Sequence, residues 1–183
     1  MHKVIRFDDR IWLFWAILVL LLPLEWLAAA AFSAVVHEIC HVILIRLLGG
    51  NICRITVKPF GAVIDTMPMD TFREMLSAAA GPAGSILLSF CMFRFPILGI
   101  CALVQGLFNC LPVYPLDGGR IVRCLLELTI SSGADKIFRW IEGIVLIFLF
   151  GMSVYLAQRF SLGFFPVFFC IFVIVKALLR KRP

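Results

Sequence analysis

The chain has 183 residues, of which 62% are hydrophobic and 15% are charged, and its mean hydropathy is +1.05. Soluble domains average about 45–50% apolar and about 25% charged residues, so this composition excludes a water-soluble globule and predicts a chain covered by lipid. The net charge of +6 does not predict nucleic-acid binding, because the basic residues lie at the ends of apolar segments. Seven scattered cysteines without a C-x-x-C pair exclude a disulfide framework.

Six apolar segments are candidate transmembrane helices. They cover about residues 11–22, 26–48, 75–93, 97–111, 137–156 and 164–179. The first follows a charged start without a small-residue cleavage site, so it is expected to be a retained helix rather than a signal peptide. The second stops at Gly49-Gly50-Asn51, a typical helix terminator. The expected fold class is an all-α polytopic membrane protein.

The distribution of lysine and arginine predicts the orientation. With six spans, one side of the membrane holds both termini and the loops after the second and fourth spans. All 17 basic residues lie on that side except Arg94 and Arg159. Because positive residues are enriched in cytoplasmic loops, the sequence predicts a multi-pass protein of the cell membrane with both termini in the cytoplasm.

The second segment contains the sequence His-Glu-Ile-Cys-His at residues 37–41. Residues four apart share a helix face, so the imidazoles of His37 and His41 can hold one zinc ion at about 2.0–2.1 Å from each nitrogen. Glu38 can act as the general base on a water in the open coordination position. Incidental polar residues are a poor alternative, because ionisable groups inside a span are costly and usually functional. The motif predicts a zinc metalloprotease.

After this span, polar and apolar residues alternate through residues 51–65, with a turn at Lys58-Pro59-Phe60-Gly61. The alternation predicts a short membrane-associated β-hairpin. Its edge offers a place for an unwound substrate strand to pair, but an ordinary surface hairpin would have the same pattern. The sequence does not choose between the two.

A catalytic zinc site uses three protein ligands and one open position. The extended motif H-E-x-x-H-x-x-G-x-x-H is excluded, because Leu44 and Leu47 occupy its last two defined positions. Asp117 is an acidic residue in a stretch rich in proline and glycine at the end of the fourth span. Irregular backbone at membrane depth is tolerated only where protein buries it or it lines a wet cavity. Asp117 is the predicted third ligand, and a cap on the following helix is the alternative.

Together these motifs resemble the site-2 protease family of intramembrane zinc metalloproteases (peptidase family M50). The H-E-x-x-H in one span is paired with N-x-x-P-x-x-P-L-D-G-G in a later one, here Asn109 to Gly119. Pro59-Phe60-Gly61 and Gly81-Pro82 also match. The resemblance covers about Trp12–Leu179, and the six-span layout looks most like the branch of the sporulation stage IV factor B protease.

The resemblance implies that His37, His41 and Asp117 bind Zn²⁺ and that Glu38 is the catalytic base. It implies that Asn109 lines the site and donates to the substrate backbone or the developing oxyanion. The expected reaction is cleavage of membrane-embedded or membrane-proximal segments of protein substrates, as in regulated intramembrane proteolysis of a transcription-factor precursor or its membrane-bound regulator. The expected partners are this substrate, the lipid bilayer and a regulatory membrane protein, with no nucleic acid.

The sequence departs from the family pattern in two places. Members of this branch often carry a C-terminal CBS domain and other members a PDZ domain, whereas residues 1–183 are expected to form a single intramembrane metalloprotease domain with neither. The pattern G-P-x-x-N reads Gly81-Pro82-Ala83-Gly84-Ser85 here. Serine therefore replaces asparagine, and no role is expected for Ser85.

Two other classes of membrane protein fit the motifs less well. A zinc-binding scaffold without catalysis would not need Glu38 beside its ligands. A transporter would not need the ligand spacing, and the sequence shows no repeated halves of the kind that transporters often have.

Overall fold

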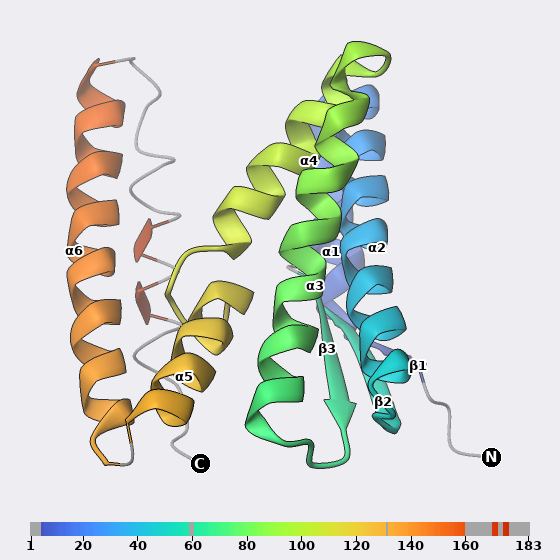
Figure 1. The fold of residues 1–183 in the computed structure, drawn as a ribbon. Helices are drawn as coiled ribbons and strands as arrows, with labels where there is room; N and C mark the ends of the chain where they lie inside the picture. The colour runs from blue at the N-terminus through green and yellow to red at the C-terminus, as the bar shows by residue number, and fades with distance from the viewer. Residues whose placement is uncertain (1–4, 59–60, 131, 160–169, 172–173, 176–183) are drawn as a thin grey trace. The chain divides into compact units, whose positions relative to one another are not determined.

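The computed structural model describes residues 5–58, 61–130, 132–159, 170–171 and 174–175. The chain divides into two compact units, Met1–Asn109 and Cys110–Pro183, whose elements are labelled in Figure 1. The first unit contains β1 (Ile5–Phe7), α1 (Arg10–Leu21), α2 (Leu24–Leu47), β2 (Ile52–Lys58), β3 (Gly61–Thr66), α3 (Thr71–Ser89), the 3-10 helix η1 (Phe90–Phe93) and α4 (Pro96–Asn109). The second contains α5 (Asp117–Thr129) and α6 (Ala134–Arg159).

Three helices are long and apolar enough to cross a membrane: α2, α3 together with η1, and α6. Large apolar side chains remain exposed along all of them, as at Leu47, Leu87 and Ile147, which suits a surface covered by lipid. The predicted fold class, a helical membrane protein with a small hairpin, is therefore confirmed. The predicted sixth span at 164–179 lies largely outside the described residues.

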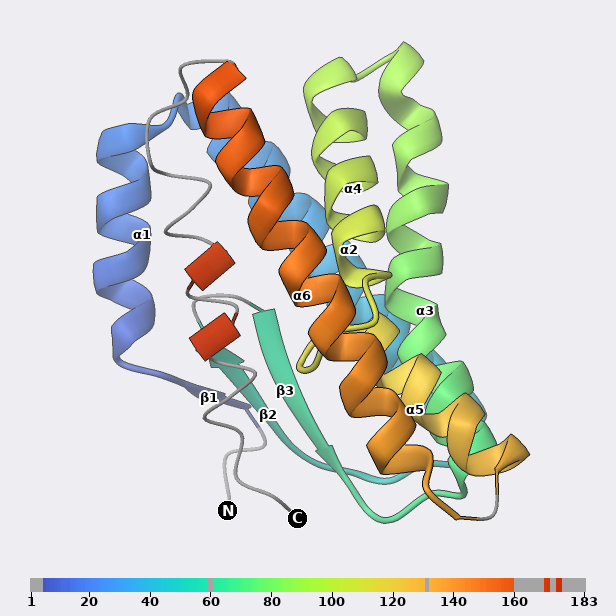
Figure 2. The same cartoon turned by 90° about the vertical axis from the view of Figure 1, so that its left-hand side faces the viewer.

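Helices α2, α3 and α4 pack against one another in the first unit, as Figures 1 and 2 show. Small side chains make this contact. Ala78 of α3 and Ala102 of α4 are fully buried, and a Cβ on Gly106 would lie 3.1 Å from Cβ of Ser85. Small residues let helix backbones approach closely where lipid supplies no hydrophobic driving force. The close approach brings polar side chains of the three helices into direct contact.

The three strands form one sheet in the order β1-β2-β3. Strands β2 and β3 are the predicted hairpin, antiparallel with Val57 opposite Ala62; two of its expected turn residues, 59 and 60, lie outside the described residues. Strand β1 pairs in parallel with β2, with Ile5 opposite Ile55. The sequence did not predict β1, because three residues are too few to display a strand period.

Helix α2 ends as the sequence predicts, at two glycines. Gly49 has a φ of +78°, a left-handed conformation that glycine adopts without steric cost. The Gly50 amide donates to the Ile45 carbonyl at 2.8 Å, and the Gly49 amide donates to the Arg46 carbonyl at 3.0 Å. This is the Schellman motif, which turns the chain out of the helix and into β2.

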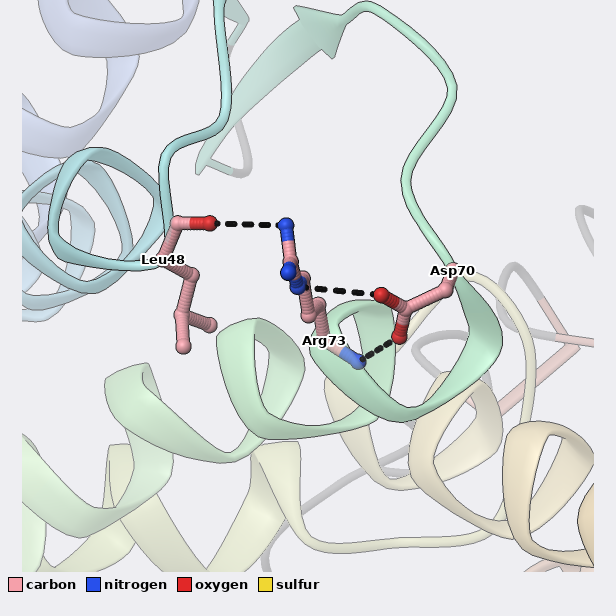
Figure 3. A network of polar contacts seen from close by, with 3 residues as sticks. All are labelled: Leu48, Asp70 and Arg73. Atoms are coloured by element: carbon pink, nitrogen blue, oxygen red, sulfur yellow. Dashed lines mark hydrogen bonds and ion pairs between the residues drawn. The ribbon is translucent and has the colours of Figure 1, made fainter.

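A small polar network joins the end of α2 to the start of α3 (Figure 3). Asp70 caps α3 by accepting the Arg73 amide at 2.9 Å, and its other oxygen pairs with Arg73 Nε at 3.0 Å. The same guanidinium donates to the Leu48 carbonyl at 3.3 Å. Both charged side chains are about half exposed, so the pair adds little stability. The network links the two helix ends across the hairpin connection.

In the second unit, α5 packs against α6. Arg123 pairs with Glu127 at 2.9 Å and with Asp135 at 3.4 Å. Ahead of α5, the Tyr114 amide donates to Glu142 Oε1 of α6 at 2.8 Å. The loop before α5 is thereby tied to α6 within the same unit.

Candidate metal centre and catalytic base

His37 and His41 lie on one buried face of α2, as the spacing predicts. Their exposed fractions are 3% and 6%, and the two Nε2 atoms are 3.2 Å apart. Two nitrogens of a tetrahedral zinc site, each about 2.05 Å from the ion, would be about 3.3 Å apart. The rings meet edge to face, with an interplanar angle of 78°. This separation fits a pair of zinc ligands.

Gly81 of α3 packs directly against this pair. A Cβ built on Gly81 would lie 2.1 Å from His41 Nε2 and 2.6 Å from His37 Nε2. Both distances are far inside van der Waals contact, so a side chain at position 81 would collide with both imidazoles. The absence of a side chain at this position therefore allows α3 to approach the histidine pair closely.

The second ring nitrogen of each histidine contacts α3. His41 Nδ1 lies 2.7 Å from the Ser77 carbonyl oxygen, and His37 Nδ1 lies 2.8 Å from Ser85 Oγ. The sequence predicts no role for Ser85, but in the structure its fully buried side chain contacts a predicted ligand. Ser77, Gly81 and Ser85 are four residues apart, which matches the spacing of the histidines and was the overlooked signal in the sequence.

Glu38 lies beside this pair on α2 and contacts the hairpin. The Ala62 amide donates to Glu38 Oε1 at 2.9 Å, and a Cβ on Gly61 would lie 3.2 Å from the same oxygen. Gly61 also has a φ of +120°, which disfavours any other residue. The Ala62 amide donates to Glu38 and therefore points away from Val57, its partner in β2. Ala62 and Val57 are thus a non-hydrogen-bonded pair of the ladder. The outer edge of β3 therefore faces Glu38.

One turn before His37, the fully buried Ser33 hydroxyl donates to Gln105 Oε1 of α4 at 2.6 Å. Asn109, the last residue of α4, donates from its side-chain amide to the Gln105 carbonyl at 3.1 Å. This bond uses one of the two amide hydrogens of Asn109. Within the part of the chain that the structure describes, no buried side-chain nitrogen or oxygen lacks a partner. The role of Asn109 towards a substrate stays a prediction.

Asp117 belongs to the second unit, where it is buried and is the first residue of α5. Leu116 occupies the cap position, so Asp117 is not the helix cap that the sequence left as an alternative. The two glycines that follow Asp117 explain why the start of α5 lies so close to the preceding loop. A Cβ on Gly118 would lie 2.2 Å from the Cys110 carbonyl oxygen, and one on Gly119 would lie 2.6 Å from the Val113 carbonyl carbon. Only glycines let this helix start pack so closely on its loop. Metal binding by Asp117 stays a prediction.

Comparison with known proteins adds a second line of information. No model of a known protein family matches the sequence. The chain is 32% identical over 131 residues to the zinc metalloprotease MJ0392 of Methanocaldococcus jannaschii, which covers 63% of this chain and 36% of that protein. It is 34% identical over 116 residues to Rip3 of Mycobacterium tuberculosis, which covers 51% of this chain and 29% of Rip3. The chain thus spans about a third of the length of these relatives.

A solved structure resembles the whole chain. The site-2 protease from Methanocaldococcus jannaschii superimposes with a TM-score of 0.69 at 20% sequence identity, covering 100% of this chain and 94% of that one. The chain therefore has the fold of that site-2 protease. Any assignment of chemistry to this chain must rest on its own residues, the histidine pair above all.

Proposed function

We propose that this chain is a zinc metalloprotease of the site-2 protease family that hydrolyses peptide bonds within or beside the membrane. One observation carries the proposal. Two buried imidazoles on a helix of membrane-spanning length hold their Nε2 atoms 3.2 Å apart beside Gly81 of α3. Ionisable side chains inside a membrane span are costly and usually functional, and this spacing suits zinc.

We infer that His37, His41 and Asp117 hold the ion. Two neutral imidazoles and one carboxylate are a donor set that catalytic zinc sites use, with the fourth position left for water or substrate. When bound, zinc supplies a Lewis acid that polarises the scissile carbonyl and makes a water molecule more acidic. Glu38, adjacent in sequence to the first ligand, takes the proton of the attacking water and returns it to the leaving amine.

The substrate is a protein segment in or close to the membrane. A helical segment hides its peptide bonds in its own hydrogen-bond ladder, so it must unwind before cleavage. The outer edge of β3 offers backbone groups to an unwound strand, and the Ala62 contact with Glu38 supports this use over that of a surface hairpin. Asn109 is the proposed donor to the substrate backbone or oxyanion.

The orientation and the biological setting are part of the same proposal. His37 lies ten residues before the end of α2 at Leu47, which is about 15 Å at 1.5 Å per residue. With the basic side in the cytoplasm, water enters from that face and cleavage falls in the cytoplasmic half of the substrate segment. The proposed setting is that of the sporulation stage IV factor B branch, with a transcription-factor precursor or its regulator as substrate and a membrane partner gating access.

Zinc content and proteolysis of a membrane-protein substrate, measured on the same purified samples, test this function. Glu38→Gln is expected to bind zinc normally and to lose hydrolysis, because the amide cannot accept the proton. Asp117→Ala is expected to lose both zinc and activity. Glu25→Gln, in the first turn of the same helix, is the matched control and should retain both. Normal turnover in Glu38→Gln would eliminate this base, and zinc binding without any hydrolysis by the native chain would favour a non-catalytic zinc protein.

A further inference from the structure

Helix α3 makes two different kinds of contact with the histidine pair. The oxygen near His41 Nδ1 is the backbone carbonyl of Ser77, at 2.7 Å, whereas the oxygen near His37 Nδ1 is the side-chain hydroxyl of Ser85, at 2.8 Å. A carbonyl oxygen can only accept, so Nδ1 of His41 carries the hydrogen and its Nε2 keeps the lone pair. The backbone carbonyl of Ser77 therefore favours the neutral His41 tautomer that can bind a metal through Nε2.

The His37 ring is held differently. A hydroxyl can donate or accept, so the contact with Ser85 admits either neutral tautomer of His37. Only the tautomer with the hydrogen on Nδ1 presents a lone pair at Nε2, on the side that faces His41 and Gly81. In that tautomer the Ser85 oxygen accepts the Nδ1 hydrogen. The serine side chain is thus the group on which the orientation of His37 depends.

Ser85 differs in this respect from its neighbours on α3. The hydroxyl of Ser77 donates to the Glu74 carbonyl at 2.8 Å, and that of Ser89 donates to the Ile86 carbonyl at 2.6 Å. Both bonds are local ones within their own helix. The Ser85 hydroxyl reaches another helix instead, although all three residues are buried. Without Ser85, Nδ1 of His37 would lose this contact with α3.

We propose, on the basis of the metalloprotease function proposed above, that Ser85 is a positioning residue of the metal centre. It accepts the Nδ1 hydrogen of His37 and thereby fixes the ring and its tautomer, so that Nε2 faces the ion. Partners of this kind on metal-binding histidines typically contribute about 10–100-fold to metal affinity. The expected size of the effect makes the role measurable through zinc binding itself, without reference to proteolysis.

The first test is the zinc affinity of the purified full chain in detergent, measured by competition with a chelator. Ser85→Ala removes the acceptor and is expected to weaken zinc binding about 10–100-fold. Ser89→Ala is the matched control, since it removes a buried hydroxyl one turn further along the same helix. The proposal is overturned if Ser85→Ala binds zinc within about twofold of the native chain, or if Ser89→Ala loses as much.

A second pair of variants separates the hydrogen bond from packing. Ser85→Thr keeps the hydroxyl and Ser85→Val lacks it, while both add similar bulk near Gly106. The threonine variant is expected to bind zinc at least about tenfold more tightly than the valine variant, with equal melting temperatures in the metal-free state. Equal zinc affinities in the two variants would mean that Ser85 acts through packing, which overturns the proposal.

The native chain and His41→Ala distinguish this failure from failure of the proposed function. If the native chain binds zinc and His41→Ala does not, the metal centre stands and the Ser85 variants decide the positioning role alone. If the native chain holds no zinc, or His41→Ala holds it as tightly, the metalloprotease function fails and the positioning role fails with it.

Discussion

At the level of single residues, the two imidazoles pack against α3 at a position that has no side chain, Gly81. A Cβ there would lie 2.1 Å from His41 Nε2, well inside van der Waals contact. The neighbouring Pro82 and Ser85 are buried as well, so α3 has little room to retreat. Glycine at this position is required by the close approach of the two imidazoles rather than by backbone conformation.

The substitution Gly81→Ala is therefore expected to abolish zinc binding and hydrolysis together. Its methyl group would occupy the space in front of both Nε2 atoms, and overpacking of this kind costs about 1–3 kcal/mol of stability. Zinc content and thermal unfolding of the purified variant are the measurements. Gly143→Ala is the control, because a Cβ at Gly143 of α6 meets no atom within 4 Å. Stoichiometric zinc in Gly81→Ala would show that the metal site does not depend on this close packing.

The sequence predicted the histidine pair because four-residue spacing on a helix is a local property. It did not predict the contacts of Ser77 and Ser85, because these depend on how α2 and α3 align, which no local pattern records. Because serine replaces the asparagine of the family pattern at position 85, the sequence predicts no role for this residue. In the structure the shorter side chain still reaches His37.

At the level of elements, the hairpin does more than connect α2 to α3. Its second strand places the Ala62 amide on Glu38, so the proposed base is held by the same strand that is proposed to receive the substrate. Alternation and the turn sequence predicted β2 and β3 correctly. The bond to Glu38 was not predictable, because it depends on which edge of the hairpin faces α2.

Replacement of Ala62 by proline tests this bond, because proline has no amide hydrogen. Proline is tolerated on an edge strand where the lost hydrogen points away from the ladder. Ala62→Pro is expected to keep zinc but to slow hydrolysis at least about tenfold, since a hydrogen bond to a charged group contributes about 1.5–3 kcal/mol. Ala62→Val retains the amide and should cleave at a rate near that of the native chain. Undiminished hydrolysis by the proline variant would show that Glu38 does not need this bond.

At the level of the whole molecule, composition predicted the membrane class, and the helix lengths agree with it. Five of the six predicted spans correspond to described helices, with ends shifted by a few residues. The sixth predicted span, residues 164–179, lies largely outside the described residues. The predicted side of the membrane for each loop rests on the positive-inside pattern.

Thiol labelling in intact cells tests this orientation. In a background without other cysteines, Cys53 of β2 is exposed and is expected to be protected from a membrane-impermeant reagent, because the proposed orientation places it on the cytoplasmic side. Arg94→Cys, in the exposed turn after η1, is expected to be labelled, and so is Arg159→Cys at the end of α6. All three should react after the membrane is permeabilised. The reverse pattern would invert the topology and move the cut to the other half of the substrate segment.

The unequal lengths of the outer strands have a consequence for self-association. Strand β1 pairs with β2 over three residues, whereas β3 extends over six, and a short edge strand is a poor template for a further chain. Another chain that joins this sheet is therefore directed to β3, whose outer edge faces Glu38. Two copies of the protein that paired there would each cover Glu38 of the other. A dimer formed through the sheet would therefore be inactive in hydrolysis until a substrate strand displaced one copy.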